Sequence, residues 1–392
     1  MTPMLTFFPV GNGDMTLVQL VDGSAILIDC NIRLSADDPS DSTSRDVARD
    51  LRQRLKLDEN KRPYLDAFLL SHPDEDHCRG LRKHFYLGRL EDYPDDDKPA
   101  AEKRIIIREM WSSPIVFRRA SKLHVLCDDA KAWATEARRR VARFKEFGWA
   151  GTGDRIQIMG EDKGEKTKGL EAILVRSGEF VTKINGAYSP HFSAHLLAPS
   201  LVCDDDEEVL LRAKNQSSVI LNIEVNATWA GHTKFRFLTA GDAEVAIWER
   251  LWNKHSEAPE VLAYDVLQAP HHCSWRVLSC ESWSDCGEEA EVSAGARSAL
   301  GQARYGAKII ASSKPIKDED SDPPCTRAKR EYEDILEDKF GKFLCTGETP
   351  FAWSPSPIEI EITTDGPRVC PVEAATAVAA TAAAAAPRAG CV

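Results

Sequence analysis

The chain has 392 residues, of which 43% are hydrophobic and 29% charged, a globular composition that can supply a sizeable core. Its net charge of −12 argues against a protein that grips a long nucleic-acid duplex, but it is compatible with a small phosphate-bearing substrate held by metal ions. No apolar run approaches the roughly 20 residues of a membrane helix, and the N-terminus lacks a signal-peptide pattern. The 11 cysteines include no Cys-x-x-Cys pair, which argues against a disulfide framework and a zinc ribbon. We therefore expect a cytoplasmic protein without a membrane partner.

Hydrophobic periodicity predicts strands and helices along most of the chain, without an internal repeat. Short apolar runs bounded by turns rich in glycine, asparagine and aspartate predict strands, and apolar positions four apart predict helices. In chain order, the predicted strands cover residues 5–10, 15–20, 25–30, 67–70, 104–108, 155–159, 170–175, 194–199, 218–225, 235–240, 263–268, 307–312, 342–346 and 358–363. The predicted helices cover residues 44–57, 81–86, 128–147, 243–252, 288–304 and 327–340.

The strand over residues 67–70 runs directly into a cluster of metal-competent side chains. Two histidines and three acids lie within the six positions from 72 to 77. His72, Asp74 and Asp76 alternate, so an extended loop would turn all three toward one side, and His77 follows where a helix can begin. Imidazole and carboxylate groups on such a loop are the usual ligands of a metal ion.

Two later strands end in further candidate ligands. Asp242 follows the strand over residues 235–240, and His271 and His272 follow the strand over residues 263–268. Ligands at separate strand ends can converge at one edge of a sheet, where sites of sheet-based enzymes commonly lie. The sequence therefore predicts a metal centre assembled from three strand ends.

These motifs together resemble the metallo-β-lactamase fold, and most closely the hydrolase domain of the ComEC/Rec2 DNA-uptake proteins. The resemblance covers residues 5–363 and rests on Val10-Gly11-Asn12-Gly13-Asp14, His72-Pro73-Asp74-Glu75-Asp76-His77, Asn215-Gln216-Ser217-Ser218-Val219 and Pro270-His271-His272-Cys273-Ser274. It implies an α/β fold, an αββα sandwich with loop and helix insertions, formed by one hydrolase domain over residues 1–365. We expect residues 366–392, which are rich in alanine, to form a disordered tail.

The resemblance also implies a set of metal ligands. The first position would have His72, Asp74 and Asp242, with water or Asn215, and the second would have Asp76, His77, Asp242 and His271, so that Asp242 bridges the two. His271 is favoured as the late ligand, with His272 as the alternative. The chain departs from the family pattern in three ways: Asp74 replaces a histidine, the mid-chain histidine has no counterpart, and Cys273 replaces a glycine.

The ligand types indicate one or two divalent ions. The oxygen-rich first position favours Mn²⁺ or Mg²⁺, and the mixed second position suits Zn²⁺, Mn²⁺ or Fe. Residues expected to support the ligands or contact substrate are Asp14, Asp29, Asn215, Ser218 and Ser274.

The predicted function is a metal-dependent hydrolase, a phosphodiesterase or nuclease acting on a nucleic acid or nucleotide through a metal-activated hydroxide. Asp76 would orient that hydroxide or take its proton, and His272 or Ser274 would contact the leaving group or the phosphate. The acidic net charge favours a nucleotide or a single strand as substrate. The basic turn around Arg138 is more typical of a solvated face than of a phosphate site, but a nuclease would be expected to bind phosphate through basic residues near Arg104 or Arg138.

Two alternatives stay open at this point. One is a non-catalytic or regulatory binding module that retained the fold, which the missing mid-chain histidine favours. The other is an ester, thioester or lactone hydrolase. The sequence predicts no particular protein partner.

Overall fold

Two large β-sheets organise the chain in the computed structural model, which describes residues 2–37, 44–114, 125–161, 167–200, 215–231, 234–317 and 321–371. In the described part, the first sheet has nine strands in the order β11 (Leu174–Val175), β10 (Arg155–Met159), β9 (Glu109–Ser112), β6 (Ala67–Leu70), β3 (Ala25–Ile28), β2 (Thr16–Gln19), β1 (Met4–Phe7), β23 (Ile358–Thr363) and β24 (Gly366–Val369). The second has seven described strands in the order β12 (Phe180–Val181), β15 (Phe192–Ala198), β16 (Ile220–Asn226), β17 (Lys234–Thr239), β18 (Tyr264–Gln268), β19 (Ala303–Ala311) and β20 (Lys342–Cys345).

Smaller elements complete the described chain. A short sheet joins β5 (Tyr64–Leu65), β8 (Ile105–Ile107) and β7 (Phe85–Tyr86). Two hairpins pair β13 (Lys183–Ile184) with β14 (Ala187–Tyr188) and β21 (Pro350–Phe351) with β22 (Ser354–Pro355). The strand β4 (Cys30–Asn31) makes isolated bridges to residues 78 and 79. The α-helices are α1 (Val47–Arg54), α2 (Glu75–Cys78), α3 (Leu81–His84), α4 (Asp128–Phe147), α6 (Val245–His255), α7 (Trp283–Cys286), α8 (Ala294–Leu300) and α9 (Thr326–Glu337).

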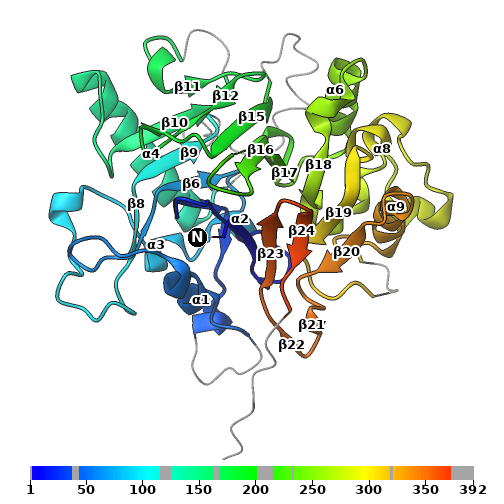
Figure 1. Cartoon of the computed structure of the whole chain (residues 1–392), viewed down its shortest axis with the longest axis horizontal. Helices are drawn as coiled ribbons and strands as arrows, with labels where there is room; N and C mark the ends of the chain where they lie inside the picture. Colours follow the sequence, from blue (N-terminus) through cyan, green and yellow to red (C-terminus); the bar gives the residue numbers. More distant parts are fainter. Residues whose placement is uncertain are drawn as a thin grey trace, which may run out of the picture.

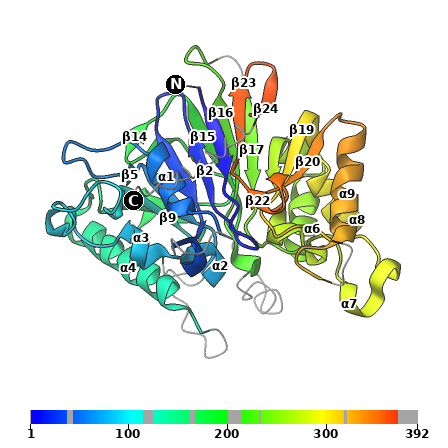
Figure 2. The ribbon, with the colours of Figure 1, turned by 90° about the horizontal axis from the view of Figure 1, so that it is seen from below.

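The two sheets pack face to face and helices cover their outer faces. Alternate side chains of β1, such as Phe7, meet those of the second sheet, and the rings of Phe7 and Phe237 lie edge to face at 5.7 Å. On the outer face of the first sheet, Leu17 belongs to the same apolar cluster as Leu51 of α1 and Trp133 of α4. The outer face of the second sheet packs against α6, α8 and α9. The layers therefore follow the order helix, sheet, sheet, helix, as Figure 2 shows.

Strand direction places several strand ends together. The strands β17 to β20 of the second sheet are parallel, as are β3, β6, β9 and β10 of the first. Parallel neighbours end at the same edge of a sheet, so the loops that follow them are neighbours too. Figure 1 shows β6 and α2 beside the second sheet.

The predicted α/β class is confirmed, and most of the predicted elements are present. The helix predicted over residues 128–147 is α4: the Cys127 side chain accepts a hydrogen bond from the backbone of Ala130, and Gly148 ends the helix at φ 72°. Within residues 288–304 the α-helix covers only Ala294–Leu300, because β19 begins at Ala303. Within residues 170–175 a 3₁₀ turn (Glu171–Ile173) precedes the short strand β11.

The central strand β9 was not predicted from the sequence. Its first residue, Glu109, is buried and accepts hydrogen bonds from the Trp111 indole (3.0 Å) and the backbone of Asn185 (2.8 Å). The strand predicted over residues 104–108 is present as β8, and it belongs to the small sheet.

The C-terminal boundary also differs from the expected one. Gly366–Val369 forms β24 and pairs with β23, so the first sheet continues past residue 365. The alanine-rich residues 372–392 lie outside the described residues. No helix in the described ranges combines the length and the apolar character that a bilayer crossing requires.

Candidate metal centre

Asp242 lies in the middle of a buried group of histidines. The strand β17 ends at Thr239, and the turn through Gly241 delivers the Asp242 carboxylate to the edge where β6 and β18 also end. Gly241 has φ 50°, and a Cβ there would lie 2.9 Å from Oγ of Ser71 and 3.0 Å from Oγ of Ser218. Glycine is therefore the residue that fits this turn.

Each oxygen of the Asp242 carboxylate faces two imidazoles. Oδ1 lies 3.0 Å from Nε2 of His77 and 3.5 Å from Nε2 of His272. Oδ2 lies 3.6 Å from Nε2 of His72 and 3.7 Å from Nε2 of His271. One carboxylate thus joins two pairs of nitrogen atoms, which is an arrangement suited to a bridging ligand.

Further carboxylates surround these imidazoles, Asp14, Asp74 and Asp76 among them. Asp76 Oδ2 lies 3.3 Å from Nε2 of His272, and Asp74 Oδ2 lies 3.8 Å from Nε2 of His72. Asp14 Oδ1 lies 3.4 Å from Nδ1 of His272. Asp74 and Asp76 are the more exposed members, with 22% and 35% of their side-chain surface accessible, so the centre opens to solvent on their side.

Four buried residues bring ligand atoms within 4.8 Å of one another: Asp14, His77, Asp242 and His272. Several side-chain atoms of the centre are buried without a hydrogen-bond partner: Asp14 Oδ1, His72 Nε2, His77 Nε2, Asp242 Oδ1, His271 Nδ1 and His272 Nε2. Buried polar atoms normally have partners, because leaving one unpaired costs about 1–3 kcal/mol. A cation among these atoms would satisfy them together, so the residues present fit a metal ion.

Hydrogen bonds outside the centre fix how two imidazoles point. Asp29 Oδ2 accepts from the Ser71 hydroxyl (2.6 Å) and from Nδ1 of His77 (2.8 Å). The same Ser71 oxygen lies 3.0 Å from Nδ1 of His72, where it can accept the ring proton. With a metal bound, both rings would then carry their proton on Nδ1 and offer the lone pair of Nε2 to the ion. This arrangement matches the outer partners that metal-bound histidines commonly have.

The charges of the centre shift its pKa values in the direction of ion pairs. Burial disfavours the charged form of Asp242, but His77, His272 and His72 outweigh it and hold the pKa of Asp242 well below its usual range. Burial likewise opposes charge on His77, but Asp242 and Asp29 raise its pKa well above the usual value. In the ion-free protein, protons therefore supply the positive charge that a metal would bring.

Opposing effects also act on Asp76 and His272. Burial favours the neutral form of Asp76, but the nearby His272 and the charge of His77 hold the pKa of Asp76 well below its usual range. For His272, burial lowers the pKa, but Asp242, Asp14 and Asp76 raise it to about 10. Asp76 is thus ionised and His272 carries a proton at neutral pH.

The loop with the two late histidines has an unusual backbone. His271, His272 and Cys273 have φ values of 49°, 53° and 68°, in the left-handed region that residues other than glycine rarely occupy. Such strain costs about 1–3 kcal/mol per residue and concentrates at functional sites. The backbone N–H of Gly13 points at Nδ1 of His272 from 3.2 Å and helps to hold this loop.

The conformation of this loop decides which oxygen of Asp242 each late histidine faces. The ligand set expected from the sequence grouped His271 with Asp76 and His77. In the structure, His272 lies beside Asp76 and His77, while His271 lies on the other side with His72.

The remaining candidates lie around the centre rather than in it. Ser218 Oγ accepts a hydrogen bond from the backbone of Asp242 (3.1 Å), and Asn215 Nδ2 donates to Oε1 of Glu244 (3.1 Å). Ser274 is fully buried, and its Oγ caps the next turn by accepting from the backbone of Arg276 (3.2 Å).

Two contacts to the late histidines were not predicted from the sequence. They involve Glu244, whose Oε1 lies 3.8 Å from Nδ1 of His271, and the Gly13 backbone. The contact of Glu244 with His271 could have been suspected from the sequence, because Glu244 lies only two residues after Asp242. The second joins residues 259 apart in the chain, so no local pattern announces it.

The fold and the site together define an α/β protein with a candidate metal centre at the ends of strands from both sheets. No protein-family model matches this chain, and no curated protein matches it either. Among solved structures, the long form of RNase Z from yeast aligns with a TM-score of 0.35 and 13% sequence identity, over 91% of this chain and 42% of that one. The chain thus spans less than half the length of that protein.

Proposed function

We propose that this chain is a metal-dependent hydrolase of the metallo-β-lactamase fold, in the ComEC-like branch, that cleaves a phosphodiester bond in a nucleotide or a single-stranded nucleic acid. One observation carries the metal dependence: buried, unpaired nitrogen and oxygen atoms converge on the two sides of the Asp242 carboxylate. The fold family rests on the four motifs and on the helix, sheet, sheet, helix layers.

Two sets of residues would hold metal. On the Oδ1 side they are Asp14, Asp76, His77, Asp242 and His272, and on the Oδ2 side they are His72, Asp74, Asp242 and His271. Both sides mix imidazole and carboxylate, which suits Zn²⁺ or Mn²⁺ better than Mg²⁺. Divalent ions in such a centre lower the pKa of water and neutralise the charge of a phosphodiester.

The chain's own residues perform the other tasks. Asp29 and Ser71 orient the two imidazoles nearest Asp242. Asp76 is ionised and partly exposed, so it can orient a water molecule by accepting a hydrogen bond, while its lowered pKa makes it a weak acceptor of a proton. His272 would give up its proton when its Nε2 holds the metal, so it would act as a ligand beside Asp76 and not as the proton donor to the leaving oxygen.

The described cysteines bear on the compartment. All nine are free thiols, and five of them are buried in the apolar clusters beneath the outer helices. A protein folded in an oxidising compartment would be expected to pair some of them. We propose a cytoplasmic location.

Metal analysis and a one-phosphodiester substrate test this function. Purified protein should contain a divalent metal and hydrolyse bis-p-nitrophenyl phosphate with added Mn²⁺ or Zn²⁺. The variant Asp76→Ala/His77→Ala should lose both, by at least 100-fold in turnover. The control is His195→Ala, which removes a histidine that stacks on Phe180 away from the centre and should behave as wild type.

Each contrary outcome has a definite meaning. Metal-free wild type would overturn the metal centre. Bound metal with full turnover in the double variant would overturn the assignment of these residues. If the wild-type protein binds metal but does not hydrolyse the phosphodiester, the result would favour the ester, thioester or lactone hydrolase or the non-catalytic module.

A further inference from the structure

Two cysteine thiols face each other where α2 meets α4. Sγ of Cys78, the last residue of α2, lies 3.5 Å from Sγ of Cys127, the residue that precedes α4. Cys78 is 1% exposed and Cys127 is half-buried, while Val125, just before Cys127 in the chain, is 82% exposed. The pair thus has one buried member and one member close to solvent.

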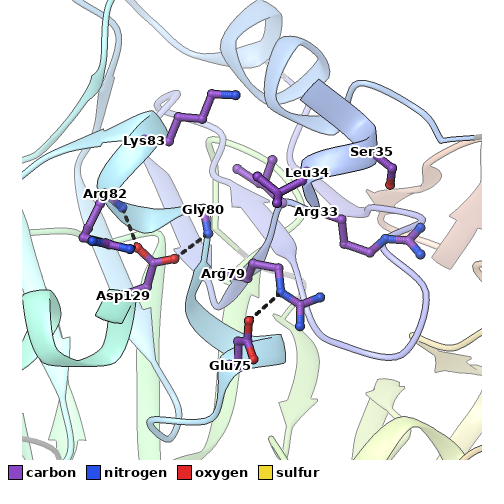
Figure 3. A pocket seen from close by; sticks show the side chains of 10 residues that line it. Arg33, Leu34, Ser35, Glu75, Arg79, Gly80, Arg82, Lys83 and Asp129 are labelled. Carbon is purple, nitrogen blue, oxygen red and sulfur yellow. Dashed lines mark hydrogen bonds and ion pairs between the residues drawn. The ribbon is translucent and has the colours of Figure 1, made fainter. Parts of the chain in front are cut away.

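Hydrogen bonds between the two segments keep the thiols together. Asp129, in the first turn of α4, accepts hydrogen bonds from the backbone N–H groups of Gly80 (3.0 Å) and Arg82 (3.0 Å) and from Nε of Arg82 (3.0 Å). Arg82 also forms an ion pair with Asp128 (3.5 Å). Figure 3 shows Asp129 facing Gly80 and Arg82 in the wall of a pocket. The start of α4 is therefore fastened to the segment that follows Cys78.

The surroundings of Cys127 favour its thiolate. Its sulfur accepts a hydrogen bond from the backbone N–H of Ala130 (3.4 Å) at the beginning of the 20-residue helix α4, where the helix dipole stabilises negative charge. The Cys78 thiol and the backbone N–H groups of Ala130 and Asp129 outweigh the effect of burial and lower the pKa of Cys127 to about 6. The thiolate is the form of cysteine that attacks a disulfide, so Cys127 is the more reactive member of the pair.

The other cysteines of the described chain lack such a sulfur partner. Cys30 is buried beside α2, but its Sγ donates to the carbonyl oxygen of Arg79 (3.6 Å). Cys280 and Cys286 are exposed. Among the nine described cysteines, Cys78 and Cys127 are the pair whose sulfur atoms are in hydrogen-bonding contact. These two thiols are therefore the pair placed to form a disulfide in the folded protein.

We propose that Cys127 and Cys78 form a modification site at which a small disulfide of the glutathione type oxidises the protein. The Cys127 thiolate attacks one sulfur of the small disulfide, so that a mixed disulfide forms and one small thiolate leaves. Cys78 then gives up its proton and attacks the Cys127 sulfur, which forms the protein disulfide and releases the second small thiolate. The two cysteines lose two electrons and two protons, and two small thiols are produced.

The distance between the sulfur atoms suits the second step. They must approach from 3.5 Å to about 2.05 Å, and rotation about the Cα–Cβ bonds moves them in this direction. Cys78 exchanges its hydrogen bond to the carbonyl oxygen of Asp74 (3.1 Å) for the new bond. The reaction requires no metal ion, so it is independent of the proposed function. In a reducing compartment the pair stays as two thiols, and the disulfide forms when the pool of small thiols is oxidised.

Mass spectrometry after oxidation tests this site. The full-length protein is equilibrated in EDTA with buffers of different ratios of reduced to oxidised glutathione, and acid followed by an alkylating reagent stops the exchange. Trypsin places Cys78 and Cys127 in separate peptides, each without another cysteine. The linked Cys78–Cys127 peptide should increase with the fraction of oxidised glutathione and exceed every other cysteine link at least tenfold.

Two serine variants separate the roles of the thiols. Cys78→Ser removes the second thiol, so glutathione should stay bound to Cys127 at a level at least tenfold above that of the wild type. Serine is a favourable residue at the start of a helix, so Cys127→Ser should fold, and its buried Cys78 should take up no glutathione. Cys280→Ser is the matched control at an exposed cysteine and should leave the yield of the linked peptide unchanged.

The contrary results are distinct. Wild-type protein in which Cys127 stays unmodified overturns the site, and so does glutathione on Cys127 without any linked peptide. A dominant link between Cys78 and Cys30 overturns the assignment of the pair. Glutathione on Cys78 in a folded Cys127→Ser protein overturns the assignment of Cys127 as the attacking thiol.

Discussion

Replacing Asp29 by asparagine tests how the histidines of the centre are oriented. Asp29 is buried, and its carboxylate accepts three hydrogen bonds: at Oδ1 from the backbone N–H of Ser71 (2.7 Å), and at Oδ2 from the Ser71 hydroxyl (2.6 Å) and from Nδ1 of His77 (2.8 Å). Asparagine has the same shape and tolerates the φ of 56° at this position. The change therefore alters hydrogen bonding without straining the backbone.

The amide cannot replace the carboxylate in either orientation. With its oxygen at the Oδ2 position, its NH₂ group opposes the backbone N–H of Ser71, and one buried donor is left unpaired. With its NH₂ group at the Oδ2 position, it faces His77 and moves the ring proton from Nδ1 to Nε2, where a metal would bind. Changes to such outer partners typically weaken metal binding 10- to 100-fold. That corresponds to about 1.4–2.8 kcal/mol.

Competition with a chromophoric chelator for Zn²⁺ measures this loss at neutral pH, and urea unfolding measures stability separately. The control is Asp66→Asn, because Asp66 also accepts a backbone N–H, that of Ala25 (3.0 Å), but contacts no histidine of the centre. It should lose stability and keep its zinc affinity. A folded Asp29→Asn protein with wild-type zinc affinity would refute the role of Asp29 in orienting His77.

Three further outcomes are expected. In Gly241→Ala, the new Cβ would stand 2.9 Å from Ser71 Oγ at a φ of 50°; urea unfolding should show a loss of about 1–2 kcal/mol, and metal content should fall. In Glu136→Gln, the buried Arg140 loses its carboxylate, which should cost about 3–5 kcal/mol at neutral pH. Burial raises the pKa of Glu136, but its arginine partners lower it more. The stability that ionised Glu136 contributes is therefore fully present above the pKa of the unfolded state and is lost as pH falls toward the pKa of the folded state. Urea unfolding of the wild type at several pH values should show this loss. The raised pKa of His77 means that metal binding must release a proton, so zinc affinity should rise with pH, and calorimetry in buffers of different ionisation enthalpy should detect the release.

The strand ends that carry the candidate ligands could be predicted from the sequence because their signals are local. An apolar run followed by His72, or by Gly241 and Asp242, reads as a strand and a turn with metal-competent side chains. The arrangement of His271 and His272 could not be predicted in this way. It depends on three successive left-handed residues without glycine, which the surrounding structure imposes.

Burial of charged residues was the other feature that local patterns concealed. Arg140 sits in a basic run and reads as exposed, yet the structure buries it because Glu136, one turn earlier, neutralises it. Glu109 is buried for a similar reason, since Trp111 and Asn185 satisfy its carboxylate. A buried charge depends on partners from several segments, and sequence periodicity carries no information about them.

The pairing of β1 with β23 has a consequence for biosynthesis. Met4–Phe7 leaves the ribosome early, but its partner Ile358–Thr363 follows more than 350 residues later, so one edge of β1 waits unpaired during most of translation. Gly13 and His272, which meet at the centre, are separated by 259 residues, or roughly 13–50 s of synthesis at 5–20 residues per second. Metal can therefore bind the complete centre only after most of the chain has been synthesised. A nascent chain that stalls before β23 would leave the edge of β1 unpaired, where chaperones could bind it.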